Sequence, residues 1–306
     1  MYMPENITKK TMRISVVGAG KIAHSLVPAL QAAGYIVNAV FSKTERSAVE
    51  LAEKFNIGIF SNDLSALPNN SSLIFLAVPD SQIKTAARLL SRSNSNLNNK
   101  IIAHLSGSLT TDELNILREK GALTASFHIM QTFPERKSVD INDCYCAIET
   151  DDKKADKVLF TVAADLKLKP FKISSTDKIL YHLLGVVSSN FQISNFIAAE
   201  KISRNIKSNI PPVVDLVFPT AFTTLLNIKS KGVNQSLSGP IERGEIEIIK
   251  EHIRKIKKDK LLALNYILAS LNLLEAAKSK SAAKSENHNK IKKYLMKQLH
   301  KYTRGF

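Results

Sequence analysis

The 306-residue chain is 44% hydrophobic and 23% charged, a composition typical of a folded globular protein, and its length predicts two domains rather than one. It contains no run of about 18 apolar residues, so we expect no membrane span, and its first residues lack the apolar core of a secretory signal. The two cysteines, Cys144 and Cys146, are too few for a disulfide framework and favour the reducing cytoplasm.

The net charge of +16 is concentrated near the end of the chain, where residues 250–306 hold fifteen Lys or Arg against four Asp or Glu. Such a segment could bind nucleic acid or an anionic membrane surface, but a solvated lysine-rich helix has the same composition. No aromatic platform or recognised nucleic-acid motif accompanies the charge, so we expect no nucleic-acid partner.

Short apolar runs alternate with helix-like segments in the first half of the chain. The strand-like runs are RISVVG, YIVNAVFS, GIFSN, SLIFLAVP, KIIAHLSG, ALTASFH, CYCAIET and LKPFKIS. The helix-like segments, with apolar residues three and four apart, are TERSAVELAEKF, SQIKTAARLL and TTDELNILREKG. This alternation predicts an α/β fold, a doubly wound parallel sheet with helices on both faces, over residues 1–172.

From about residue 174 the pattern becomes entirely helical. We expect one long helix over DKILYHLLGVVSSNFQISNFIAAEKIS, then a helix capped by Gly232, then two more, in a helical domain over residues 173–277. Residues 278–306 are expected to form a polar linker, KSKSAAKSENHNK, and a short basic helix. The apolar face of LLALNYILASLNLLEAA predicts a homodimer.

The first strand-like run meets the first helix at the sequence GAGKIA, a G-x-G-x-x-A pattern. Gly18 permits a tight turn, Gly20 lets a ligand approach the backbone, and Ala23 lets the helix lie close to the sheet. A dinucleotide pyrophosphate would then lie at the positive end of the helix, although a merely tight turn has the same pattern. The predicted cofactor contacts in this turn are Gly18, Ala19, Gly20, Lys21 and Ile22.

The end of the second strand discriminates between cofactors. NAD sites place an acid there, but this sequence has no Asp or Glu between Glu5 and Glu45. Instead it offers two hydroxyls and two cations, which suit a 2′-phosphate and predict NADP, unless they are ordinary surface residues. These residues are Ser42, Lys43, Thr44 and Arg46.

The stretches GAGKIA, FLAVPDSQI, HLSGSL and SFHIMQTFP resemble the Rossmann branch of pyrroline-carboxylate reductases, β-hydroxyacid dehydrogenases and deazaflavin-dependent NADP reductases. YHLLGVVSSNF and SGPIERGE narrow the resemblance to the family that pairs a Rossmann-like NADP-oxidoreductase domain with the helical domain of unknown function 2520. The resemblance covers about residues 12–277 and implies that Ala77, Val78, Pro79 and Ser106 lie along the cofactor.

Hydride transfer also needs a group that gives or takes a proton. His182 heads the long helix, and Asn190 projects from nearly the same face, where it could hold a carbonyl, although both could equally pack against a neighbouring helix. The catalytic lysine of β-hydroxyacid dehydrogenases would fall at Val186, so their mechanism does not transfer. His128 is a further candidate, with a structural role as the alternative. No metal site is expected, because Cys144 and Cys146 alone provide too few ligands.

Together these features predict an NADP-dependent oxidoreductase that acts on a small, anionic carbonyl or imine in a cleft between the domains. The alternative is a non-catalytic NADPH-binding sensor or partner protein.

Overall fold

The computed structural model describes residues 12–93, 96–280 and 284–304. The chain divides into two compact units, Met1–Asn190 and Phe191–Phe306, which are described separately below.

The first unit is built on one eight-stranded sheet in the order β3-β2-β1-β4-β5-β6-β7-β8. All neighbouring strands are parallel except β6 and β7, which are antiparallel. All eight predicted strand-like runs form strands. Their bounds are β1 Arg13–Val17, β2 Ile36–Phe41, β3 Ile59–Ser61, β4 Leu73–Leu76, β5 Ile101–His104, β6 Leu123–Ile129, β7 Tyr145–Glu149 and β8 Lys169–Lys172.

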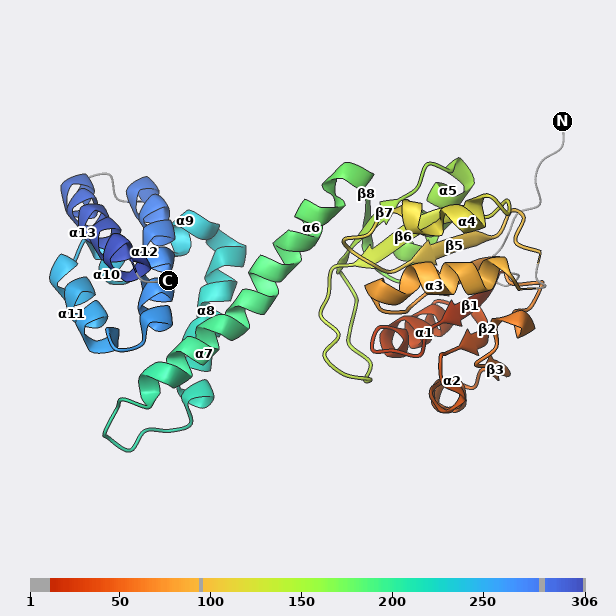
Figure 1. The fold of residues 1–306 in the computed structure, drawn as a ribbon, viewed down its shortest axis with the longest axis horizontal. Helices are drawn as coiled ribbons and strands as arrows, with labels where there is room; N and C mark the ends of the chain where they lie inside the picture. Colours follow the sequence, from red (N-terminus) through yellow and green to blue (C-terminus); the bar gives the residue numbers. More distant parts are fainter. Residues whose placement is uncertain (1–11, 94–95, 281–283, 305–306) are drawn as a thin grey trace. The chain divides into compact units, whose positions relative to one another are not determined.

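Helices cover both faces of this sheet (Figure 1). Successive strand residues point to opposite faces, and both sets are apolar here, so each face needs a covering layer. Leu73 and Phe75 of β4 join a core with α1 (Ala23–Ala32), α2 (Glu45–Phe55) and α5 (Lys153–Asp165). Ile74 and Leu76 join a second core with α3 (Asp80–Ser91) and α4 (Asn115–Arg118). The predicted doubly wound fold is therefore confirmed.

Two helices of this unit differ from expectation. The segment TTDELNILREKG, predicted as one helix, forms a 3₁₀ turn over Thr111–Leu114 followed by the four-residue α4. Helix α5 was not predicted, although Asp152 caps it by accepting the Ala155 N–H at 2.7 Å.

The predicted long helix is α6 (Lys178–Gly185), a π-helical segment (Val186–Asn190) and α7 (Phe191–Ser203) in succession. Helix α6 belongs to the sheet unit, so the compact unit extends 18 residues beyond the predicted domain boundary at residue 172. The reason is that Lys178 and Tyr181 are buried against the sheet.

The second unit contains α7, α8 (Val213–Lys231), α9 (Val233–Ser236), α10 (Pro240–Arg243), α11 (Ile246–Ile256), α12 (Lys260–Lys280) and α13 (Ser285–Thr303). Gly232 ends α8 as predicted, with φ +79° and its N–H on the Ile228 carbonyl. Helices α10 to α13 share the core, with Ile249, Ile267, Leu274 and Ile291 among its members.

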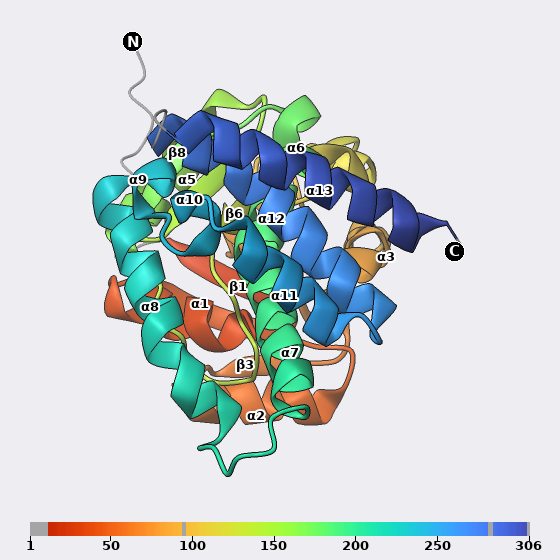
Figure 2. The ribbon, with the colours of Figure 1, turned by 90° about the vertical axis from the view of Figure 1, so that its left-hand side faces the viewer.

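The last helix is longer and better packed than predicted. Helix α13 begins at Ser285, inside the segment expected to be a linker, and packs along α12 (Figure 2). The prediction of a linker followed by a short helix was wrong in this respect. His288, Ile291 and Leu295 are spaced three and four residues apart, so one face of α13 is buried.

Helix α12 is long and apolar enough to cross a membrane by length and composition alone. Leu262, Ile267, Leu274 and Ala277 are nevertheless buried in the core of the second unit, which accounts for much of its apolar character. Part of the apolar face that was expected on α12 for a partner is therefore internal, while Leu261, Leu268 and Leu273 remain exposed. In contrast, neither α7 nor α8 has a buried residue, and both expose large apolar side chains: Phe191, Ile193, Ile197, Val214, Leu216, Phe218, Phe222, Leu225 and Leu226.

Candidate active site at the carboxyl ends of the strands

The turn that follows β1 is built around Gly18. Its φ of +115° lies in the region that glycine tolerates, and its N–H donates to the Phe41 carbonyl at 2.7 Å. A Cβ on Gly18 would lie 2.2 Å from the Ala77 carbonyl oxygen, so only glycine fits between the ends of β2 and β4. A Cβ on Gly20 would meet only that oxygen, at 3.7 Å, so a ligand could approach the Gly20 backbone.

The start of α1 can accept an anion. Ile22 precedes the helix, no side chain caps this end, and the first turn contains no acid. The unpaired N–H groups of a helix start attract negative charge, so the predicted contacts Ala19, Lys21 and Ile22 surround a suitable position.

The predicted 2′-phosphate residues lie at the same edge, because Phe41 ends β2 and accepts the Gly18 N–H. Ser42 is half-buried, whereas Lys43 and Thr44 are exposed. The Arg46 side chain is 89% exposed, and its Nε donates to Glu50 Oε1 at 2.8 Å. Arg46 therefore points along α2 in this structure rather than across the turn.

The ends of β4 and β5 are joined by a polar cluster. Ala77 is buried, Val78 is half-buried and Pro79 is exposed just before α3. The buried Ser106 hydroxyl donates to Asp80 Oδ2 at 2.7 Å, and Ser108 donates to the same oxygen at 3.0 Å. Ser106, predicted to contact the cofactor, thus has its hydroxyl proton committed to Asp80.

His104, at the end of β5, has both ring nitrogens bonded to nearby backbone groups, which suits a structural role. Its Nδ1 accepts the Ser106 N–H at 3.2 Å and its Nε2–H donates to the Thr110 carbonyl at 3.1 Å. Burial, assisted by the charge of Lys178, lowers the pKa of His104 to about 4, so the ring is neutral at pH 7.

His128 is held between α6 and the loop after β5. A 2.9 Å hydrogen bond joins its Nδ1 to the Tyr181 hydroxyl, and the two rings meet edge to face. On the other side, a Cβ on Gly107 would lie 2.8 Å from His128 Nε2, so Gly107 makes room for the ring. Burial is the main cause that lowers the pKa of His128 to about 4; Lys178 and His182 lower it further, and Asp80 opposes them.

His182 and Asn190 lie on the same continuous helical stretch, with His182 half-buried and Asn190 exposed. No hydrogen bond joins the His182 ring to another described residue. In an uninterrupted α-helix of about 100° per residue, Asn190 would stand about 80° from His182. The π-helical segment Val186–Asn190 interrupts the α-helix between them, so the angular spacing of the two residues differs from that value.

Lys178 and Tyr181 were not predicted as site residues from the sequence. Lys178 is 1% exposed, and its ammonium faces Glu149 at 3.6 Å. The available signal was the spacing of Lys178, Tyr181 and His182 at positions i, i+3 and i+4, which puts them on one helix face.

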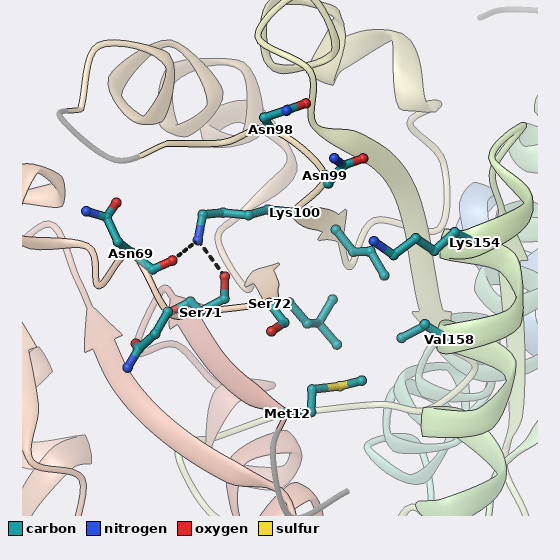
Figure 3. A pocket seen from close by; sticks show the side chains of 12 residues that line it. Met12, Asn69, Ser71, Ser72, Asn98, Asn99, Lys100, Lys154 and Val158 are labelled. Carbon is teal, nitrogen blue, oxygen red and sulfur yellow. Dashed lines mark hydrogen bonds between the residues drawn. The ribbon is translucent and has the colours of Figure 1, made fainter. Parts of the chain in front are cut away.

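A hollow of about 280 Å³ lies at the opposite edge of the sheet (Figure 3). Met12, Ser72 and Lys100 line it, and these residues directly precede β1, β4 and β5. Lys100 Nζ donates to the carbonyl oxygens of Asn69 at 2.5 Å and Ser71 at 2.7 Å. Ligands of open parallel sheets bind at the carboxyl ends of the strands, so this hollow is separate from the candidate site.

Among the described residues, no group of three or more His, Cys, Asp or Glu side chains could hold a metal ion. Cys144 and Cys146 are free, and burial raises the pKa of the Cys146 thiol.

A doubly wound sheet with a glycine turn after its first strand defines a Rossmann-like domain, and residues 2–129 match the family model of that description. Residues 144–272 match the domain of unknown function 2520. The chain therefore belongs to the family in which a Rossmann-like domain precedes this domain, as the sequence motifs indicated.

Solved structures share the fold over most of the chain. BF3122 of Bacteroides fragilis, described as a candidate NADP oxidoreductase, is 24% identical with a TM-score of 0.73, over 87% of this chain and 99% of that one. Protein TM1727 of Thermotoga maritima is 25% identical with a TM-score of 0.69, over 87% and 99%. A pyrroline-5-carboxylate reductase of Coxiella burnetii is 16% identical with a TM-score of 0.56, over 90% and 98%.

One curated relative shares a shorter segment. The human glucose-fructose oxidoreductase domain-containing protein 2 is 37% identical over 68 residues, which are 22% of this chain and 18% of that protein. The chain thus matches less than a fifth of that relative's length.

Proposed function

We propose that the protein is an NADP-dependent oxidoreductase that transfers a hydride to or from a small, anionic carbonyl or imine compound. The observation that carries the proposal is the turn after β1, where Gly18 leaves no room for a side chain beside Ala77 and α1 begins without a cap or an acid. Such a turn suits a diphosphate, because the backbone and the helix start offer N–H groups to it.

The residues at this edge fit NADP. The backbone of Gly18 to Ile22 would hold the diphosphate, and Ser42, Lys43, Thr44 and Arg46 would hold the 2′-phosphate. Arg46 is exposed and bonded only to the exposed Glu50, so its guanidinium can turn from one anion to another at small cost. When bound, the nicotinamide of the cofactor would supply or accept the hydride.

The proton would come from His182, with Asn190 positioning the substrate carbonyl or imine. The ring of His182 is half-buried and uncommitted, whereas both nitrogens of His128 face close neighbours, Tyr181 and Gly107. His182 is therefore our candidate for the proton donor, and His128 is better suited to shaping the site as a neutral group. The description of BF3122 as a candidate NADP oxidoreductase supports this class of activity.

The test has two stages on the full-length chain. We expect fluorescence titration to give a tighter Kd for NADPH than for NADH, and equal affinities would contradict the cofactor assignment. NADPH oxidation is then followed with a panel of 2-oxoacids, cyclic imines and aldehydes. Binding without turnover of any compound would favour the alternative, a non-catalytic NADPH sensor.

In the second stage, His182→Ala should lower kcat for the accepted compound by about 100-fold, the usual contribution of a general acid. NADPH affinity should stay within about twofold, because the substitution leaves the Gly18 turn untouched. His252→Ala is the matched control, since His252 is an exposed histidine of α11 in the second unit. Unchanged turnover in His182→Ala would remove His182 from the mechanism.

We also propose that the protein acts in the cytoplasm as a homodimer. The support for a second copy is the apolar surface of α7 and α8, which extends over more side chains than isolated exposed residues would. Analytical ultracentrifugation should show a dimer that Leu216→Lys combined with Phe222→Lys converts to a monomer. A monomeric native protein at micromolar concentration would contradict this part of the proposal.

A further inference from the structure

The side chain of Lys178 is the most completely buried cation among the described residues. Its Nζ donates to the Ser106 carbonyl at 3.1 Å and to the Ser126 hydroxyl, and it faces Glu149 Oε2 at 3.6 Å. These three partners come from the loop after β5, from β6 and from the end of β7. One ammonium at the first residue of α6 therefore joins three parts of the sheet.

Glu149 is committed to this arrangement from its other side. Its Oε1 accepts both the N–H and the hydroxyl of Thr111 at 3.1 Å. No hydrogen bond reaches Oε2 from a described residue, so Lys178 is the only cation placed to compensate that buried oxygen. Because both partners are nearly inaccessible to water, neither can be replaced by solvent without rearrangement.

The position of Lys178 fixes how α6 runs along β6. Lys178 meets Ser126, Tyr181 meets His128, and Gly185 approaches Met130, where a Cβ would lie 3.0 Å from the sulfur. Steps of three and four helix residues advance about 4.5–6 Å, and steps of two strand residues advance about 6.6 Å. The rise per contact is therefore similar along α6 and β6, so the three contacts can form together. The contact of Lys178 with Ser126 is the first of them and sets the register.

The same ammonium acts on the His128 ring electrostatically. The charged or titratable groups that affect His128 are Lys178 and His182 on α6 and Asp80 at the start of α3. Lys178 and His182 oppose protonation of the ring, Asp80 favours it, and burial opposes it most strongly. Loss of the Lys178 charge should therefore raise the pKa of His128.

We propose that Lys178 is a positioning residue of the candidate active site: its ion pair with Glu149 and its bonds to Ser106 and Ser126 set the register of α6 on β6, and thereby place Tyr181 against His128. This inference rests on the proposed function for its catalytic consequence, since His182 follows Tyr181 on the same helix. The placement itself is independent of any reaction.

The first experiment measures the His128 ring directly. In full-length protein labelled with ¹⁵N-histidine, the side-chain nitrogens of His128 are titrated by NMR in the native chain and in Lys178→Met, which keeps an unbranched side chain one atom shorter and removes the charge. We expect the pKa of His128 to rise from about 4, because the opposing charge is lost, and the Nδ1 signal of the Tyr181 bond to change. An unchanged titration of His128 would overturn the proposal.

A second variant guards against failure to fold. Lys178→Met leaves the Glu149 carboxylate buried without a cation, whereas Lys178→Met combined with Glu149→Gln removes both charges together. The double variant should fold, as circular dichroism would show, and should still give the raised pKa of His128. Lys100→Met is the matched control at the opposite end of β5 and should leave the His128 titration unchanged.

The catalytic consequence is tested separately, so that it can fail without the placement failing. With a compound that the native protein reduces, the double variant should lose about tenfold or more in kcat while its KM for NADPH stays within twofold. A raised pKa of His128 with unchanged kcat would retain Lys178 as the anchor of α6 and overturn its link to the reaction. Absence of turnover in the native protein would reject the proposed function, whereas the titration would still decide the placement.

Discussion

The two ends of β5 each bury a lysine, and the two lysines are held in different ways. Lys100, 7% exposed, directly precedes the strand and donates to two backbone carbonyls. Lys178, 1% exposed, lies against the loop that follows the strand and faces a carboxylate. At the amino end the ammonium closes a loop, whereas at the carboxyl end it brings charge to a cluster of Ser, Glu, Tyr and His side chains. The carboxyl end is the one at which we propose the active site.

Two glycines give the largest expected contrast between these edges. Gly18→Ala, at the carboxyl edge, would force alanine into a positive φ and place its Cβ 2.2 Å from a backbone oxygen. It should lower the free energy of unfolding by about 3–5 kcal/mol and abolish NADPH binding. Gly34→Ala, just before β2, has φ +88° but meets nothing within 4 Å, and should cost about 1–2 kcal/mol with unchanged NADPH affinity. Thermal melts and NADPH titration measure both, and similar losses in the two variants would contradict the contrast.

The two lysines themselves provide the next test. Lys178→Met leaves the buried Glu149 carboxylate without a cation and should lower the free energy of unfolding by about 3–5 kcal/mol. Lys100→Met leaves only the Asn69 and Ser71 carbonyls unpaired and should cost about 1–3 kcal/mol. Native-state hydrogen exchange of the β5 amides measures both values on the same strand. A larger loss for Lys100→Met would reverse the comparison.

Acid should lower the stability of the protein through the buried histidines at the carboxyl ends of the strands. His104 and His128 have pKa values of about 4 in the folded protein against about 6.5 unfolded, so below pH 6.5 the unfolded chain binds more protons. The free energy of unfolding should fall as the pH drops from 6.5 to 4, by about 2 kcal/mol per histidine at pH 5. Urea midpoints at pH 7 and pH 5 measure the loss, which His128→Gln should reduce.

Lys100 acts in the opposite range of pH. Burial lowers its folded pKa below 10.5, so its contribution to stability should increase as the pH rises toward that value. Lys100→Met should remove this alkaline gain and leave the acid loss intact. An acid loss that disappears in Lys100→Met would show that the two ends of β5 are not independent.

The smallest expected effect concerns the specificity of the cofactor site. Arg46→Ala should weaken the affinity for NADPH about tenfold, or by about 1.4 kcal/mol of binding free energy, and leave the affinity for NADH unchanged. Glu50→Gln is its control, because it removes the anion that holds Arg46 and should preserve or improve NADPH binding. Equal weakening of NADPH and NADH by Arg46→Ala would place Arg46 away from the 2′-phosphate.

The fold was largely predictable because the spacing of apolar residues within short segments indicates most of its strands and helices. Most of the eight strands are short apolar runs, and the G-x-G-x-x-A turn marks the junction of β1 and α1. Helix α13 was partly missed, because the three residues that it buries are spread through a lysine-rich segment. The compact unit boundary at Asn190 was missed because α6 has the same helical pattern as α7, and only contacts with the sheet separate them.

The candidate site was predicted unevenly for a related reason. The proposed roles of Gly18 and of residues 42–46 depend on backbone shape and sequence position, so their spacing alone was enough to predict them. Lys178 and Glu149 lie 29 positions apart and are joined only when β7 and α6 come together. A lysine is usually exposed, and no local pattern shows that this one is buried.

The sequence by itself determined the strand and helix types, the glycine turn after β1 and the cationic residues after β2, because each depends on neighbours within a few positions. Only the tertiary structure decided which histidines are buried, that Lys178 is buried beside Glu149, and that a π-helical segment lies between His182 and α7. Those outcomes depend on burial and on partners distant in the chain, and a buried charge or hydrogen bond is defined by what surrounds it rather than by what precedes it.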